Sequence, residues 1–126
     1  MSISNAIDCD IHPGVPTIKV LLPYMSDYWR ESFTARGQDN FQPASYLPNA
    51  PIACRSDWRD GDAIPGSNFD LLQKHALDGF GSRLAICNVL YGGSFSISET
   101  MGAAICSAVN DWVKAQWLDR DPRLRA

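Results

Sequence analysis

Residues 7–13 read IDCDIHP, and this short alternating stretch organises the rest of the chain. Alternation of apolar and polar residues with a period of two is typical of a β-strand, whose side chains point to opposite faces in turn. The apolar side carries Ile7, Cys9 and Ile11, and the polar side carries Asp8, Asp10 and His12. Pro13 ends the strand, because proline lacks the N–H that a strand ladder needs.

Asp10 and His12 lie two residues apart, so both side chains leave the same face at the C-terminal end of this strand. In α/β folds the chemistry takes place at that end of the sheet. A carboxylate and an imidazole suit zinc or manganese, which makes the pair a candidate metal site. The alternative is an edge strand whose polar side faces water. A buried parallel sheet, which the following elements indicate, argues against that alternative.

Composition predicts one modest soluble domain. The chain has 126 residues, of which 45% are hydrophobic and 20% are charged, and its formal net charge is −3. We expect no nucleic-acid partner, because no run of Lys or Arg is present. We expect no membrane partner either: residues 1–6 lack a secretory pattern, and the longest near-apolar run, 101–109, is too short for a bilayer.

The cysteines favour a cytoplasmic protein. None of the four forms a C-x-x-C pair, and three of them fall within apolar patterns. Two disulfides are the alternative, but the chain is neither small nor rich in cysteine. We therefore expect buried free thiols in a reducing compartment. The four are Cys9, Cys54, Cys87 and Cys106.

A long region with little regular structure, residues 14–65, separates the first strand from the next predicted elements. Within it, Ser26 and Gly37 bracket a predicted helix over Asp27–Arg36. The later part is interrupted by prolines, yet it contains aromatic residues, which disordered segments lack. We expect this loop to lie over the C-terminal ends of the strands and to shape a substrate pocket. Its aromatic residues include Phe41, Tyr46 and Trp58.

Regular structure resumes with a helix and a strand. An S-x-x-D pattern at Ser67 predicts a helix over residues 67–79, with His75 on its surface. Residues 83–90 are nearly all apolar, which is typical of a strand covered on both faces. We expect this strand to lie parallel and adjacent to residues 6–12.

The last part of the chain repeats this order. Ser96 and Glu99 form a capping pattern before a helical repeat that extends to about residue 118. The right-handed crossover rule predicts that this helix and the helix at 67–79 pack on the same side of the sheet. Leu124 and its neighbours predict the approach to a further strand.

Four stretches resemble a known family, the amidohydrolase-related metal-dependent hydrolases. This TIM-barrel group includes the aminocarboxymuconate-semialdehyde decarboxylase type. The match covers the chain in outline, and it is most specific over 109–124. The stretches are IDCDIHP (7–13), AICNVLYG (85–92), VNDW (109–112) and WLDRDPRL (117–124).

The resemblance implies a metal centre, with zinc first and manganese second. In the family a pair at the end of the first strand, a histidine on a later strand and an aspartate on the last strand hold the metal. Asp10 and His12 match the first pair. The common form is H-x-H, so Asp10 is a departure, although some decarboxylase-like members use a carboxylate there. Asp8 would support the pair.

The resemblance also implies a (β/α)₈ barrel, which typically needs about 250 residues. This chain offers an α/β fold with two β/α units and a long insertion after strand 1. It thus resembles the N-terminal portion of a barrel domain spanning 1–126, a partial TIM barrel. The later ligands have no counterpart, so we expect the isolated chain to bind metal weakly and to be inactive.

The expected function is an enzyme acting on a small organic substrate. It would hydrolyse a C–N or C–O bond, or remove a carboxyl group without oxidation. Asn88 and Tyr91 would approach the substrate, and simple core packing is the alternative for both. A second hypothesis is a non-catalytic half-barrel that serves binding or assembly, or the product of a truncated gene. The expected partner is the missing C-terminal half of the barrel or further copies of the chain.

Overall fold

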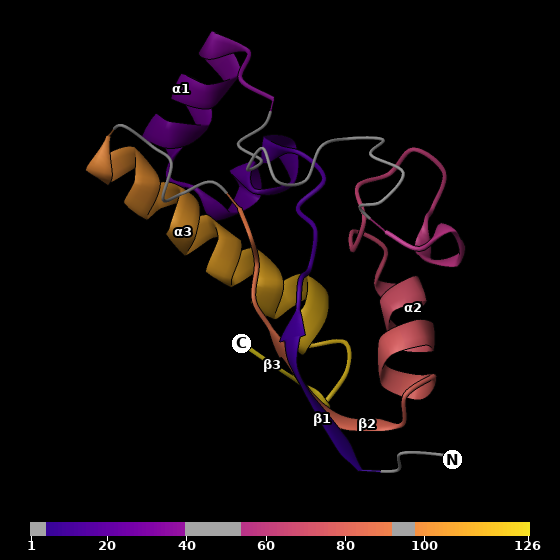
Figure 1. The fold of residues 1–126 in the computed structure, drawn as a ribbon. Coiled ribbons are helices and arrows are strands. Elements are labelled where there is room, and N and C mark those ends of the chain that lie inside the picture. Colours follow the sequence, from indigo (N-terminus) through magenta and orange to yellow (C-terminus); the bar gives the residue numbers. More distant parts are fainter. Residues whose placement is uncertain (1–4, 40–53, 92–97) are drawn as a thin grey trace.

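The computed structural model describes residues 5–39, 54–91 and 98–126. Three parallel strands form one sheet in the order β1-β2-β3, namely β1 (Ala6–Ile11), β2 (Ser82–Cys87) and β3 (Leu124–Arg125) (Figure 1). The predicted parallel pairing of the first two strands is confirmed, and so is a further strand at Leu124. The chain is a mixed α/β protein.

The strand β1 contains an irregularity that the alternating sequence did not predict. Asp8 pairs with Ala85 and Ile11 pairs with Cys87, so three steps along β1 match two along β2. Asp8 Oδ1 accepts the backbone N–H of Asp10 at 3.1 Å, a turn that competes with the ladder. The resulting bulge separates the apolar residues of β1, since Ile7 is 46% exposed and Ile11 only 5%.

Two long helical segments follow the strands. The first is α2 (Phe69–Leu72), which continues as the π-helical segment η4 (Gln73–Asp78). The second is α3 (Glu99–Val113), which continues as the π-helical segment η6 (Lys114–Leu118). Their predicted extents are close to the observed ones. The cap of the first helix is Asn68 rather than Ser67, because the Asn68 side chain accepts from two backbone N–H groups. Ser98 caps the second, and Ser96 lies outside the described residues.

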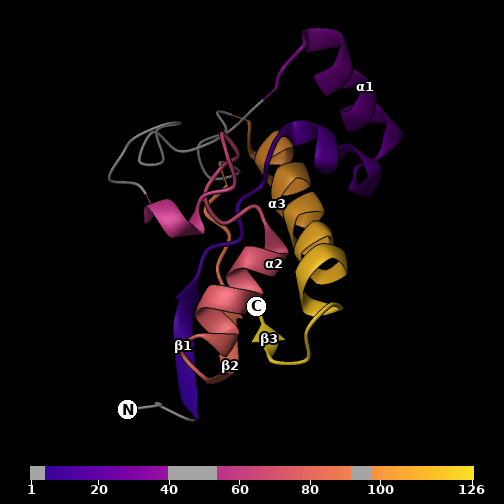
Figure 2. The same ribbon diagram turned by 90° about the vertical axis from the view of Figure 1, so that its right-hand side faces the viewer.

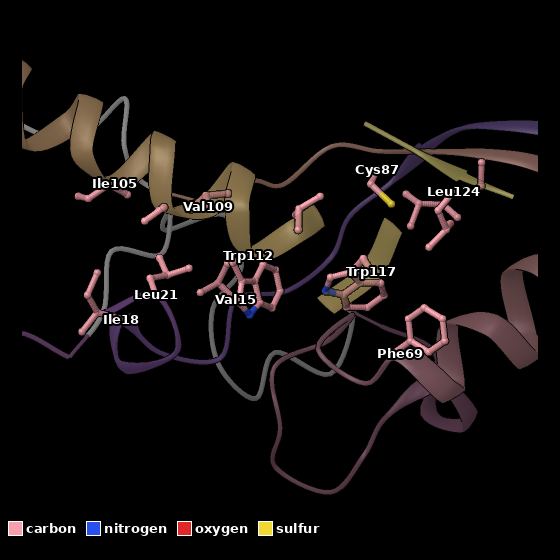
Figure 3. Packing of buried hydrophobic residues seen from close by; sticks show 14 of the residues in the cluster. Val15, Ile18, Leu21, Phe69, Cys87, Ile105, Val109, Trp112, Trp117 and Leu124 are labelled. Carbon is pink, nitrogen blue, oxygen red and sulfur yellow. The ribbon is translucent and has the colours of Figure 1, made fainter. Parts of the chain in front are cut away.

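Both helical segments cover one face of the sheet (Figure 2). Trp117 of η6 is 1% exposed (Figure 3). The centroid of its ring lies 5.4 Å from the ring centroid of Phe69 of α2 and 6.2 Å from that of Trp112 of α3. The sheet contributes Ala85, Cys87 and Leu124 to the same core. Burial of these aromatic rings stabilises the packing between sheet and helices.

The opposite face of the sheet is exposed, which corrects the expectation of a second strand covered on both faces. Ile86 of β2 is 36% exposed, and it lies on the same side as Ile7 of β1. The apolar run predicted two covered faces, but every described helix that packs on the sheet packs on the other side. Leu90, after β2, is also 40% exposed.

The burial of the cysteines also differs from the prediction. Cys87 is buried, Cys54 is half-buried, and Cys9 and Cys106 are exposed; all four are free thiols. Residue Cys9 lies on the uncovered side of β1, so its apolar neighbours in the sequence do not bury it. Burial raises the pKa of the Cys87 thiol to about 11.

The described parts of the long region lie beyond the C-terminal ends of the strands (Figures 1 and 2). The helix α1 (Asp27–Arg36) has the predicted bounds, and Gly37 ends it in the left-handed conformation with φ 59°. The described residues of this region also form the short 3₁₀ turns η1 (Ile18–Val20), η2 (Leu22–Tyr24) and η3 (Ser56–Trp58). Across the described ranges, no helix is both long and apolar enough to cross a membrane.

Candidate functional site

A cavity of about 230 Å³ lies between the C-terminal end of β1 and the helix α2. One wall comes from the strand, one from the helix, and one from the segment 58–66, which comes from far along the chain. The polar residues that line it are Asp8, Asp10, His12, Asp60 and Asn68. The remaining lining residues are mostly apolar, namely Ile11, Trp58, Ile64, Pro65, Gly66, Leu71, Leu72 and Ala76.

The structure brings the predicted pair together. His12 Nε2 lies 3.2 Å from Asp10 Oδ1, and His12 Nδ1 lies 2.7 Å from the backbone carbonyl oxygen of Asn88. A carbonyl only accepts, so Nδ1 must donate its proton to Asn88. In the neutral ring, Nε2 then carries the lone pair and faces the carboxylate. A backbone partner that fixes the tautomer in this way is a common support for a metal-binding histidine.

The spacing of the pair suits a shared metal ion. Two ligand atoms at about 2.1 Å from one zinc ion are about 3.0–3.4 Å apart when they occupy neighbouring positions. The observed separation of 3.2 Å falls in this interval, and it equally suits an ion pair in which the ring carries both protons and Nε2–H donates to the carboxylate. Within the described residues, no group of three or more His, Cys, Asp or Glu side chains could hold a metal. The pair therefore fits two positions of a coordination shell.

Asp8 supports Asp10 through the main chain. Its carboxylate accepts the Asp10 N–H within the bulge of β1. Asp10 itself is exposed, with 73% of its side chain accessible, whereas 28% of the His12 side chain is accessible. The arrangement places the imidazole inside the cavity rim and leaves the carboxylate at the mouth.

The wall opposite β1 is built by close approach of two backbones. The Gly14 N–H donates to the Gly66 carbonyl at 2.9 Å. A Cβ on Gly66 would lie 2.4 Å from the His12 carbonyl oxygen, and a Cβ on Gly14 would lie 2.7 Å from that of Pro65. Gly66 also has φ +79°, which side chains disfavour. These two glycines bring the segment after Trp58 against the histidine.

Trp58, an aromatic residue of the loop predicted to shape a substrate pocket, completes the cavity together with Asp60 and Asn68, which the sequence did not single out. Trp58 stacks on His75, with ring centroids 5.4 Å apart and an angle of 25°. Asp60 accepts from the side chain of Asn68 at 2.8 Å, and the same Asn68 caps α2. The prediction of His75 as a helix-surface residue is only half right, since the ring is half-buried under the indole. The sequence signal that could have identified Asn68 is a helix-capping residue directly before an apolar helix.

The predicted substrate contacts Asn88 and Tyr91 do not line the cavity. Asn88 contributes its backbone, which accepts from His12 and donates to the Ile11 carbonyl at 2.7 Å, while its side chain is exposed. Tyr91 is half-buried and packs against the hydrophobic core. Their role at a substrate stays a prediction.

A second polar cluster lies away from the cavity, at the start of β3. The Asp121 carboxylate is buried, and it accepts from Arg123 at 2.7 Å and from Gln73 at 3.0 Å. Arg123 also contacts Asp78 at 2.8 Å. The Arg123 guanidinium holds the pKa of the Asp121 carboxyl well below its usual range. This cluster ties the last strand to η4, a structural task typical of the N-terminal end of a parallel sheet.

Two comparisons with known proteins found no match for this chain. No model of a known protein family matches the chain, and a search of curated proteins finds no match.

Proposed function

We propose that this protein is a metal-dependent hydrolase or decarboxylase acting on a small organic substrate, with Asp10 and His12 holding part of a divalent metal centre. The single observation that supports it is the convergence of these two side chains to 3.2 Å at the rim of a cavity, at the C-terminal end of a parallel strand. The resemblance to the amidohydrolase-related enzymes points to zinc or manganese. The proposed architecture is the first two β/α units of a (β/α)₈ barrel.

Each residue of the proposed metal site has its own role. His12 Nε2 and the Asp10 carboxylate would hold the ion, and the Asn88 carbonyl keeps the imidazole in the tautomer that leaves Nε2 available. Asp8 fixes the backbone at Asp10. When bound, a divalent metal activates water for hydrolysis or binds a substrate carboxylate. In the family the remaining ligands come from later strands of the barrel, so we expect this chain alone to be inactive.

The test is a calorimetric titration of the purified chain with zinc and with manganese. We expect weak binding at one site, because two protein ligands are fewer than the three of a catalytic zinc site. Asp10→Ala and His12→Ala should each abolish it, and His75→Ala, which removes the other histidine, should not. Binding that both site variants leave unchanged would refute the proposed centre.

A second candidate function, assembly, has its own observation. Ile7 and Ile86 expose an apolar face of a parallel sheet, whereas parallel sheets are usually covered on both faces. A second copy of the chain or a C-terminal barrel half would cover it. Ile86→Lys should shift the chain toward monomer in light scattering coupled to gel filtration. A wild-type chain that is monomeric at all concentrations tested would refute self-association.

A further inference from the structure

The charges that line the cavity are of one sign. Three carboxylates, those of Asp8, Asp10 and Asp60, belong to its wall, and no Lys or Arg of the described residues lines it. Within the described ranges, the only partners of Asp8 and Asp60 are an N–H group and an amide, so neither charge is neutralised by a cation. Anionic ligands would meet repulsion from all three groups.

The rest of the cavity is suited to an apolar body. The apolar residues that line it include Ile64, Leu71, Leu72 and Ala76, together with Trp58. The indole is fixed in place, because His75 stacks on it and the Arg55 guanidinium lies 5.8 Å from its centroid. Arg55 does not line the cavity, and its charge is matched by a two-pronged contact to Asp57 at 3.0 and 2.9 Å.

The volume limits the size of the occupant. An apolar cavity of about 150 Å³ holds one benzene molecule. The cavity of about 230 Å³ therefore admits a ring of that size with a short polar tail. The carboxylates line the same cavity as the apolar residues, so a ligand with a charged end and an apolar end meets both kinds of wall.

We propose that this cavity binds a small organic cation, an ammonium group carried on an aromatic or branched aliphatic body. The ammonium would contact Asp60 and Asp8, and the body would pack against α2 and Trp58. As a statement about substrate this rests on the proposed function, and it favours hydrolysis of an amine-bearing substrate over decarboxylation of an acid. The binding preference itself requires no metal.

The test uses three probes of one shape and different charge, namely benzylamine, benzyl alcohol and benzoate. Each is titrated into the full chain at neutral pH with a chelator present, and the indole N–H signal of Trp58, assigned with Trp58→Phe, is followed by NMR. We expect benzylamine to bind most tightly and benzoate least. Asp60→Asn and Asp8→Asn keep the hydrogen-bond acceptor, and each should weaken benzylamine about fivefold while leaving benzyl alcohol unchanged.

Asp62→Asn is the matched control, since this exposed carboxylate lies two residues from Asp60 but outside the cavity. It should leave all three probes unchanged. Equal affinity for the three probes, tighter binding of benzoate, absence of any shift, or an equal loss of benzyl alcohol in Asp60→Asn would overturn the proposal. Metal binding lost in Asp10→Ala, with no preference for benzylamine, would overturn this inference alone. A preference for benzylamine without metal binding at Asp10 would overturn only the proposed metal centre.

Discussion

Substitution of Gly66 by alanine tests how the cavity is built. Gly66 lies on the segment that closes the pocket, and its backbone has φ +79°. An added Cβ would lie 2.4 Å from the carbonyl oxygen of His12, which is backbone and cannot swing away like a flexible side chain. The substitution should therefore push this segment away from the histidine and break the bond from the Gly14 N–H to the Gly66 carbonyl.

The magnitude follows from two contributions. A left-handed backbone costs an alanine about 1–2 kcal/mol relative to glycine. Relief of the overlap with His12 adds about 1–3 kcal/mol, as for overpacked interiors. We expect Gly66→Ala to lower the free energy of unfolding by about 2–5 kcal/mol. Gly61 has φ +53° and nothing within 4 Å of the added Cβ, so Gly61→Ala should lose only the first contribution.

The assay is urea unfolding at neutral pH, followed by tryptophan fluorescence, for the wild type and both variants. A second measurement follows the His12 ring signals by NMR, which should move in Gly66→Ala and stay in place in Gly61→Ala. Gly14→Ala disturbs the same contact between the two segments from the strand side, because its Cβ would lie 2.7 Å from the Pro65 carbonyl oxygen. Equal destabilisation by Gly66→Ala and Gly61→Ala would refute the reasoning.

Three further predictions concern the core and the buried polar cluster. Because its guanidinium partner depresses the pKa of Asp121, this carboxyl stabilises the fold above its unfolded pKa of about 3.9. That stabilisation should be lost as the pH falls from there toward the lower folded-state value. In urea unfolding at several pH values, Asp121→Asn should flatten this acid dependence, and Asp119→Asn, at an exposed position, should not. Cys87, whose pKa burial raises to about 11, should resist alkylation by iodoacetamide until the chain unfolds, whereas mass mapping should show the exposed thiols modified at once. Trp117→Ala should cost about 3–5 kcal/mol of unfolding free energy, since this ring is 1% exposed, and Trp29→Ala, at a half-buried ring, should cost less.

The local elements could be predicted from the sequence because their signals are local. A capping position, a left-handed glycine and a helical repeat lie within a dozen residues, so α1 was predicted to the residue at both ends. A period of two located β1, a short apolar run located β2, and helical repeats located the helices that follow them. The handedness of crossovers then made the parallel pairing of the two strands predictable.

The pairing of Asp10 with His12 was also within reach of the sequence, since two residues of one strand end start on the same face. The support around them was not. Asn88 is 76 residues from His12, and its carbonyl reaches the imidazole only because β2 lies beside β1. Asp8 was expected to support the pair, but its contact with the Asp10 N–H depends on the bulge, which alternation alone does not reveal.

Only the tertiary structure decided which faces are covered and where the cavity lies. An apolar run indicates that a strand can be buried. The number of layers that pack on the strand depends on where the helices lie, and here Ile86 stays exposed. The cavity needs Asp60 and Asn68 to meet β1, and Gly66 makes that approach feasible for steric reasons. Such contacts join positions more than 50 residues apart, for which no short pattern in the sequence provides a signal.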